Sequence, residues 1–294
     1  MPSGIIIKGI GGFYYVNTDQ GIIECKARGK FRKQDVIPLV GDKVEVDLSP
    51  HDDTKGSIES IHPRSVEMVR PPVANVDQLV IVCAIAAPAP SLMLLDKFLL
   101  AAENKGLEAV LCINKIDLDQ DKEYEKLYNI YHSAGYKVIC TSKRTKQGID
   151  ELKDILHNRI TAFAGSSGVG KSSLLNAVDP RFTLQTGEVS KKIERGKHTT
   201  RHVELLKLEN GGYVLDTPGF STFELAVIKA DELTHCYREF DNYTEQCRFR
   251  GCSHTAEPGC AVIEAVKEGS ISPTRHENYI QFYQELKKIK EWEK

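Results

Sequence analysis

The stretch that decides the fold of this 294-residue chain is Gly165-Ser166-Ser167-Gly168-Val169-Gly170-Lys171-Ser172. It matches G-x-x-x-x-G-K-[ST], the pattern of a phosphate-binding loop. Residues 159–164 before it end in an apolar run typical of a strand, and residues 173–178 after it are typical of a helix. The alternative, a Gly/Ser-rich linker that precedes a helix, does not account for Lys171 and Ser172 at the required offset. The sequence therefore predicts a nucleoside triphosphate site.

The expected chemistry of this loop follows from its backbone. Glycines let the chain approach a phosphate closely, and successive N–H groups and the helix N-terminus then face the anion. We expect Lys171 to reach the β- and γ-phosphates, and the Ser172 hydroxyl to ligate Mg²⁺. The predicted phosphate site comprises Gly165, Ser166, Ser167, Gly168, Val169, Gly170, Lys171, Ser172 and Ser173.

Two further motifs favour guanine. The first is Asn114-Lys115-Ile116-Asp117, at the end of a predicted buried strand over residues 109–113. The Asp117 carboxylate can accept hydrogen bonds from N1–H and the exocyclic amine of guanine, a pattern that adenine does not offer. We expect Lys115 to cover the base and Asn114 to tie this loop to the phosphate loop. The second is Thr141-Ser142-Lys143, which matches the remaining base-side loop of GTPases and follows a predicted strand over residues 137–140.

A third motif, Asp216-Thr217-Pro218-Gly219, ends a predicted strand over residues 212–215. We expect Asp216 to join the Mg²⁺ shell and the Gly219 N–H to sense the γ-phosphate. The next residue is Phe220, where Ras-like enzymes have the Gln that orients the attacking water. The protein alone is therefore predicted to hydrolyse GTP slowly.

A basic stretch over residues 185–201 offers a replacement for that Gln, and we expect it to form a long loop. His198 is the candidate for positioning the water, with Lys171 as the other catalytic residue. The alternative is that His198 contacts RNA or has no role. The adjacent Thr199 or Thr200 is expected to ligate Mg²⁺, and Thr200 is favoured.

The three motifs occur in an unusual order. A Ras-like GTPase begins with the phosphate loop and has N-K-x-D near its end, whereas here Asn114–Asp117 and Thr141–Lys143 precede Gly165. This order indicates a circular permutation, which a compact domain tolerates because its termini often lie close together.

Residues 1–66 are predicted to be all-β, because five short β-rich runs alternate with turn signals. This pattern favours a small barrel such as an OB-fold. Between two of its strands lie Arg28, Lys30, Phe31, Arg32 and Lys33. Basic residues interleaved with an aromatic ring suit phosphate contact and base stacking, and a solvated charged loop is the alternative. The proline-containing stretch over residues 63–72 is predicted to be a linker.

The C-terminal quarter contains Cys247, Cys252, His254 and Cys260. Three thiolates and one imidazole make a closed, structural zinc site, and four unligated side chains are the alternative. His235 and Cys236 are competing ligands. The same module contains two further basic residues, Arg248 and Arg250. Helices are predicted over residues 231–240, 261–268 and 274–294.

Composition limits the class of protein. The formal net charge of −2 excludes a globally basic nucleic-acid binder, and the apolar run over residues 79–87 is too short to span a membrane. Residues 1–5 lack the charged start of a signal peptide. We therefore expect a cytoplasmic protein with no membrane partner, and nothing in the sequence demands more than a monomer.

The permuted motifs, the barrel-like N-terminus and the Cys/His module resemble the ribosome small subunit-dependent GTPase A family of bacteria over the whole chain. The resemblance implies a multidomain α/β fold: an OB-like RNA-binding domain (1–66), a circularly permuted GTPase domain (67–228) and a helical zinc-binding domain (229–294). The Cys/His spacing matches the family's pattern at all four positions.

The resemblance also implies an activity and partners. A member of this family hydrolyses GTP to GDP and phosphate, is stimulated by the small (30S) ribosomal subunit, and acts late in subunit maturation through contacts with 16S rRNA. By this resemblance, Arg248 and Arg250 are expected to face RNA phosphates. One alternative is an RNA-binding module that uses GTP only as a structural ligand. An ATP-dependent kinase or transport ATPase is another, and the Asn114–Asp117 motif disfavours it.

Overall fold

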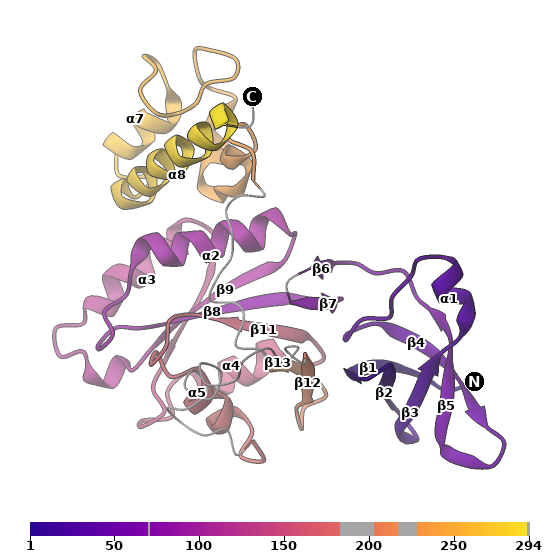
Figure 1. The fold of residues 1–294 in the computed structure, drawn as a ribbon. Helices are drawn as coiled ribbons and strands as arrows, with labels where there is room; N and C mark the ends of the chain where they lie inside the picture. The colour runs from indigo at the N-terminus through magenta and orange to yellow at the C-terminus, as the bar shows by residue number, and fades with distance from the viewer. Residues whose placement is uncertain (70, 183–202, 217–227, 293–294) are drawn as a thin grey trace. The chain divides into compact units, whose positions relative to one another are not determined.

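The computed structural model of this chain describes residues 1–69, 71–182, 203–216 and 228–292 (Figure 1). For residues 216 and 289–292 only the backbone is described. The chain divides into two compact units, and each is built from separate segments. The first consists of Met1–Gln78, Lys153–Phe163 and Gln185–Phe220, and the second of Leu79–Leu152, Ala164–Leu184 and Ser221–Lys294. No helix that the structure describes is long and apolar enough to cross a membrane.

A closed five-stranded barrel opens the first unit. Its strands are β1 (Ser3–Ile10), β2 (Phe13–Thr18), β3 (Gly21–Ala27), β4 (Lys43–Ser49) and β5 (Asp52–Ile61). The strands pair in the order β1–β2–β3–β5–β4, and β4 pairs again with β1, which closes the barrel. Ile6, Val16 and Ile58 have no exposed area and belong to its core. The predicted small β-barrel is confirmed.

Two connections in this unit differ from the sequence-based expectation. The basic stretch after β3 forms a short helix, α1 (Gly29–Lys33), instead of an open loop, because Phe31 turns inward and is buried. The predicted linker contains a two-stranded hairpin of β6 (Glu67–Val69) and β7 (Pro72–Ala74). Arg64 holds the start of this segment through a buried carboxylate, with its Nε 2.7 Å from Asp42 Oδ1.

Three more strands complete the first unit. They are β11 (Ile160–Ala164), β12 (Glu204–Lys207) and β13 (Tyr213–Asp216). β12 and β13 form an antiparallel hairpin, and β13 pairs in parallel with β11. On the other side, Glu204 of β12 pairs with Lys8 of β1, so this sheet continues into the barrel.

Strands and helices alternate in the second unit. Its strands are β8 (Gln78–Ala84), β9 (Glu108–Asn114) and β10 (Lys137–Thr141), in the order β10–β9–β8. Its helices are α2 (Leu92–Asn104), α3 (Glu123–Ser133), α5 (Lys171–Val178) and the start of α4 (Ile149–Leu156). All seven residues of β8 are buried, as expected for an apolar strand covered on both faces. The Ser91 side chain caps α2 by accepting a hydrogen bond from Leu94 N.

The C-terminal module belongs to the second unit. Its elements are the 3-10 turns η3 (Leu233–Cys236) and η4 (Arg238–Phe240), and the helices α6 (Asp241–Thr244), α7 (Ala261–Lys267) and α8 (Pro273–Trp292). The helix predicted over residues 231–240 is wrong: Tyr237 is extended between the two turns and packs its ring on Phe240 and Tyr279. The predicted helices over residues 261–268 and 274–294 are found with slightly different ends.

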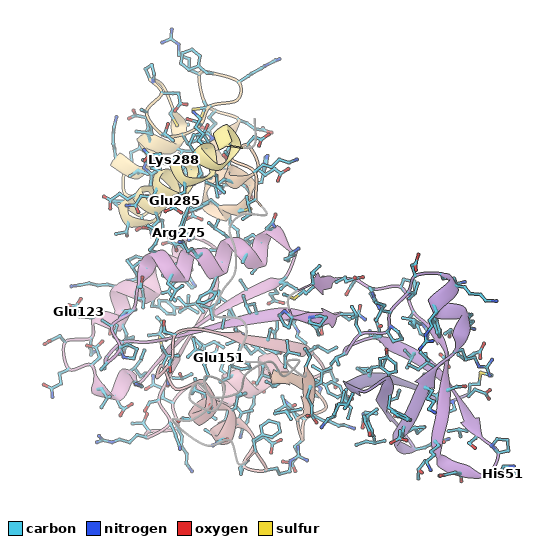
Figure 2. All side chains as sticks on the ribbon, viewed as in Figure 1. His51, Glu123, Glu151, Arg275, Glu285 and Lys288 are labelled. Atoms are coloured by element: carbon cyan, nitrogen blue, oxygen red, sulfur yellow. The ribbon has the colours of Figure 1, made fainter. Side chains whose placement is uncertain are left out.

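A buried ionic network joins this module to α2. Arg275 of α8, labelled in Figure 2, is 1% exposed. Its guanidinium binds both oxygens of Glu239, at 2.7 and 3.0 Å, and lies 2.7 Å from Asp96 Oδ1 of α2. Asp96 also accepts hydrogen bonds from Asn278 and Tyr131. Removing one partner of such a network leaves a buried charge unpaired, so the network fixes the module on α2.

Candidate nucleotide site and metal centre

The phosphate loop runs from the end of β11 to the start of α5 and depends on glycine. Gly165 has φ 135° and Gly170 has φ 100°, both in the region that favours glycine. A Cβ at Gly165 would lie 2.1 Å from the Val82 carbonyl oxygen, and one at Gly170 would lie 2.4 Å from Asn114 Nδ2. The backbone therefore packs directly against β8 and against the end of β9, which only glycine allows.

Lys171 lies over this loop. Its Nζ donates hydrogen bonds to the carbonyl oxygens of Gly165, at 2.6 Å, and Ser166, at 2.9 Å. Burial lowers the pKa of Lys171 from its ordinary value. An anion bound in the loop compensates for this lost solvation, so the position suits a phosphate ligand.

Asn114 joins the base-side motif to the phosphate loop, as the sequence predicts. Its Nδ2 donates to the Val169 carbonyl at 2.8 Å, and its Oδ1 accepts from Thr141 Oγ1 at 3.1 Å. The side chain is buried, so both contacts are shielded from water. Asn114 thus holds three predicted stretches, at residues 114–117, 141–143 and 165–172, in one place.

Lys115 makes a second link. Its backbone is left-handed, with φ 64°, and its Nζ donates to the carbonyl oxygens of Ala87 and Gly168 at 2.7 and 2.8 Å. The sequence analysis did not identify Ala87, because a residue that acts through its backbone carbonyl leaves no signal in its side chain.

The carboxylate of Asp117 is held in a fixed position. Its Oδ1 accepts a hydrogen bond from Ser142 Oγ at 2.6 Å. Ser142 is buried, and its own backbone N–H donates to the Gln147 carbonyl at 3.1 Å. The neighbouring Ile116 is buried and anchors this turn, while Lys143 is exposed. The carboxylate that we expect to recognise guanine therefore has a defined orientation.

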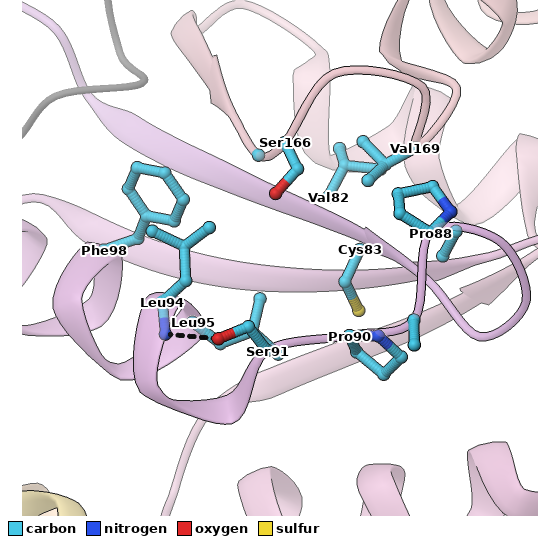
Figure 3. A pocket seen from close by; sticks show the side chains of 13 residues that line it. Val82, Cys83, Pro88, Pro90, Ser91, Leu94, Leu95, Phe98, Ser166 and Val169 are labelled. Atoms are coloured by element: carbon cyan, nitrogen blue, oxygen red, sulfur yellow. Dashed lines mark hydrogen bonds between the residues drawn. The ribbon is translucent and has the colours of Figure 1, made fainter.

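A small pocket borders the phosphate loop (Figure 3). Gly165, Ser166 and Val169 form one wall of it. The end of β8 and the first turns of α2 form the other, with residues such as Cys83, Leu94 and Phe98. The segment between β8 and α2 was not identified from sequence, because it carries no recognisable phosphate or base motif.

The predicted Mg²⁺ ligands come from different segments. Ser172 lies in the first turn of α5. Asp216 ends β13, which pairs in parallel with β11, the strand that leads into the phosphate loop. Other predicted site residues lie outside the described residues; these are His198, Thr199, Thr200, Gly219 and Phe220.

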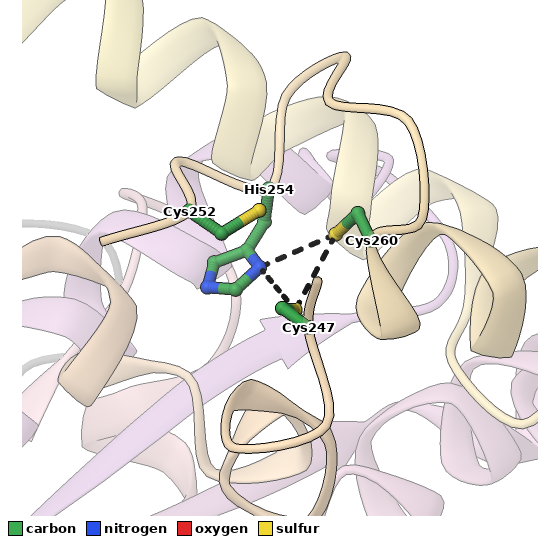
Figure 4. Close-up of side chains that lie close together, drawn as sticks. All are labelled: Cys247, Cys252, His254 and Cys260. Atoms are coloured by element: carbon green, nitrogen blue, oxygen red, sulfur yellow. Dashed lines mark hydrogen bonds between the residues drawn. The ribbon is translucent and has the colours of Figure 1, made fainter. Parts of the chain in front are cut away.

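A second cluster, in the C-terminal module, consists of Cys247, Cys252, His254 and Cys260 (Figure 4). Their ligand atoms all lie within 4.8 Å of one another. His254 Nδ1 is 3.3 Å from Cys260 Sγ and 3.6 Å from Cys247 Sγ, and these two sulfurs are 3.9 Å apart. A tetrahedral zinc with Zn–S bonds of about 2.3 Å requires sulfurs roughly 3.8 Å apart, so the donor set fits such a metal.

The surroundings of this cluster favour a bound cation. Burial raises the pKa of Cys252 to about 12 and also raises the pKa of Cys260, so thiolates there need a nearby positive charge. Burial lowers the pKa of His254, which keeps the imidazole neutral, as a metal ligand must be. His276 Nε2 lies 2.7 Å from the His254 carbonyl oxygen and fixes the backbone of this ligand.

The competing ligands lie apart from the cluster. His235 and Cys236 belong to η3, and neither is among the four residues whose ligand atoms come together. The four-residue set expected from spacing is therefore the one that the fold assembles.

The predicted RNA-facing residues differ in how they are presented. Phe31 is only 6% exposed, so the expectation of a ring free to stack on a base is wrong here. Arg28 pairs with Asp47 and Glu59, and Lys30 Nζ lies 2.6 Å from Glu59 Oε1. The other predicted basic residues are exposed; these are Arg32, Lys33, Arg248 and Arg250.

Comparisons with known proteins agree with this architecture. A family model described as RsgA N-terminal domain matches residues 3–58, and one described as RsgA GTPase matches residues 61–226. The chain is 52% identical to the small ribosomal subunit biogenesis GTPase RsgA of Caldanaerobacter subterraneus, over 97% of this chain and 95% of that protein. The protein of the same name from Alkaliphilus metalliredigens is 48% identical, over 98% of this chain and 99% of that protein.

Two solved structures share the fold. The crystal structure of YjeQ from Thermotoga maritima is 40% identical, with a TM-score of 0.84, and the match covers 97% of this chain and 98% of that one. The structure of YloQ, described as a circularly permuted GTPase, is 38% identical, with a TM-score of 0.82 over 98% and 96%. These matches confirm the permuted GTPase fold that the motif order predicted.

Proposed function

The chain belongs to the RsgA GTPase family, and from this premise we propose that it hydrolyses GTP to GDP and phosphate in the biogenesis of the small ribosomal subunit. The observation that carries this proposal is the position of Asn114, hydrogen-bonded to both Val169 and Thr141. Through it, the loops that read a guanine base and the loop that binds phosphates form one continuous site.

We assign the nucleotide contacts as follows. Asp117 accepts hydrogen bonds from the guanine base, in the orientation that Ser142 sets. Lys115 covers the base, and residues 141–143 line its other side. Residues 165–173 surround the phosphates, and Lys171 exchanges its contacts with loop carbonyls for contacts with the β- and γ-phosphates. The Gly219 N–H senses the γ-phosphate. Lys171 neutralises charge that develops on the phosphates during transfer.

GTP is bound together with Mg²⁺, for which Ser172, Thr200 and Asp216 are the proposed protein ligands. This ion neutralises phosphate charge when it is bound. His198 is proposed to position the attacking water, because the sequence has Phe220 where a water-orienting Gln would stand. Docking on the small subunit is proposed to stimulate turnover through His198.

The metal of the C-terminal cluster is proposed to be zinc with a structural role. The four donors would fill all positions of a tetrahedral zinc ion and would leave none open for a substrate. The ion would hold together the loops around Cys247 and Cys260, while Arg275 connects the module to α2.

We further propose three functional parts, at residues 1–66, 67–228 and 229–294, of which the first and third contact 16S rRNA late in assembly. Arg32, Lys33, Arg248 and Arg250 are the exposed basic residues proposed to contact RNA. The protein is proposed to act as a cytoplasmic monomer.

The direct test is GTP turnover by the purified protein, with and without small ribosomal subunits, and with ATP and large subunits as controls. We expect small subunits to stimulate the turnover of GTP but not of ATP, and large subunits to stimulate neither. Absence of stimulation under conditions where the protein binds GTP would remove the ribosomal part of the proposal.

Two variants test the residue assignments. Asp117→Asn should lower the preference for GTP over ATP by one to two orders of magnitude, because a hydrogen bond to a charged group contributes about 1.5–3 kcal/mol. Asp121→Asn, at an exposed carboxylate nearby, is the matched control. His198→Ala should reduce stimulated turnover; unchanged turnover with normal subunit binding would exclude the role of His198.

A further inference from the structure

A short loop of the C-terminal module presents an exposed aromatic ring. The loop consists of Arg248, Phe249, Arg250 and Gly251, and Phe249 is 46% exposed. Phe249 is one of eight large hydrophobic side chains exposed in the part of the chain that the structure describes. Unlike the other seven, it lies directly between two arginines.

The loop is held at both ends. Cys247 precedes it and Cys252 follows it, and both belong to the metal cluster. The Arg248 N–H donates to the Gly259 carbonyl at 3.0 Å, and the Arg248 stem packs over Gly259, where a Cβ would lie 3.1 Å from Arg248 Cβ. The loop that carries the ring is therefore held in one conformation, so little conformational entropy is lost when the ring binds a partner.

The charges around the ring are available to a partner. The Arg248 guanidinium carbon lies 5.4 Å from the centre of the Phe249 ring. Within the described residues, neither Arg248 nor Arg250 forms an ion pair. The Glu257 carboxylate, in the same module, instead accepts hydrogen bonds from the backbone N–H groups of Ser253, Thr255 and Ala256.

We propose that Phe249 stacks on an unpaired RNA base while Arg248 and Arg250 contact the flanking phosphates. An aromatic ring offers a stacking surface to any base, and the arginines add charge-assisted contacts. In an A-form duplex the bases are stacked on one another, so a single exposed ring selects a base in a loop, bulge or end. That the RNA belongs to the small ribosomal subunit rests on the proposed function.

The test uses the full-length, zinc-loaded protein. Fluorescence anisotropy measures its binding to a labelled oligouridylate of about twelve nucleotides, a length within the usual site sizes of single-strand binders, and to an RNA duplex of the same length. Phe249→Ala should weaken binding to the single strand by about 5- to 100-fold, while duplex binding is unchanged. Phe249→Tyr should retain binding, and Val69→Ala, at another exposed apolar side chain, is the matched control.

Several results would overturn the inference. One is that Phe249→Ala binds the single strand with unchanged affinity. Another is that it loses affinity for the duplex as much as for the single strand. Both apply to a variant that retains its metal and its circular dichroism spectrum. A variant that binds small subunits more weakly but both RNA probes normally would assign Phe249 to a ribosomal protein instead. If small subunits do not stimulate turnover by the wild-type protein, the proposed function is refuted while the oligonucleotide result stands. The two failures are therefore distinguishable.

Discussion

Two stretches of this chain have the same local pattern and opposite surroundings. Lys30-Phe31-Arg32 in the barrel and Arg248-Phe249-Arg250 in the C-terminal module both place an aromatic ring between two cations. In both, the preceding cation lies near the ring, at 5.6 Å for Lys30 and 5.4 Å for Arg248. Yet Phe31 is 6% exposed and Phe249 is 46% exposed.

The secondary structure of each stretch and its neighbours explain this difference in exposure. Lys30-Phe31-Arg32 lies in helix α1, which turns one face to the barrel core and buries Phe31 there. Strands β4 and β5 bring Asp47 and Glu59 to the basic residues at this site. Arg248-Phe249-Arg250 lies in a loop between Cys247 and Cys252, two of the four clustered side chains, and all three of its residues are exposed. A basic–aromatic–basic pattern therefore offers its ring to a partner only where the fold leaves that ring exposed.

The largest expected effect comes from removing the metal. A structural zinc contributes about 10–16 kcal/mol in zinc-finger peptides near pH 7, so its loss should unfold the loops around Cys247 and Cys260 while α1 remains folded. Hydrogen exchange should show loss of protection over residues 247–260 and none over residues 29–33. Cys252→Ser should lose the metal and Cys236→Ser should keep it; equal metal content in both variants would contradict this ligand set.

Truncating the two rings should change the stability of the protein by different amounts. Phe31→Ala removes a buried side chain and should destabilise the barrel by about 3–5 kcal/mol. Phe249→Ala removes an exposed one and should change stability by less than about 0.5 kcal/mol. Native-state hydrogen exchange of the barrel and of the C-terminal module measures both. Similar losses for the two variants would mean that Phe249 is buried by a contact in solution.

The arginines should differ in how they affect the salt dependence of RNA binding. Each single-strand phosphate contact contributes about 0.7 to the slope of log K against log salt. Arg248→Ala and Arg250→Ala should each make this negative slope shallower by about this amount. Arg28→Ala should change it less, because Arg28 is paired with Asp47 and Glu59. Salt titrations with the oligouridylate probe test this, and an equal effect of Arg28→Ala would break the distinction.

The smallest effect is expected from releasing the barrel cations. Glu59→Gln removes the partner of Lys30 and one partner of Arg28, and should raise the affinity for RNA by less than about fivefold, since exposed ion pairs contribute little. Glu67→Gln is the matched control, because its partner Arg64 stays bound to Asp42. A fall in affinity with Glu59→Gln would show that Glu59 positions the cations for RNA.

Much of the site could be predicted because its chemistry depends on contiguous residues. Gly165 to Ser172 and Asn114 to Asp117 are each complete motifs within one segment, and strand patterns before them placed both at strand ends. Their order alone predicted the permuted domain. The Cys/His spacing likewise predicted which four side chains come together, since all four lie within fourteen consecutive residues, 247–260.

Contacts between distant segments could not be predicted in this way. Neither the bond from Lys115 to the Ala87 carbonyl nor the pairing of Arg275 with Asp96 has a sequence signature, because each partner is ordinary in its own segment. The break of the predicted helix at Tyr237 also results from packing, here against Phe240 and Tyr279.

The sequence by itself determined the nucleotide class, the permuted order of the GTPase motifs and which four Cys and His side chains cluster in the C-terminal module. These depend on residue type and spacing, which short-range geometry converts directly into a site. Only the tertiary structure decided which basic–aromatic–basic stretch is exposed. Exposure depends on what the rest of the chain packs against a side chain, and for Phe31 and Phe249 the local sequences are nearly the same.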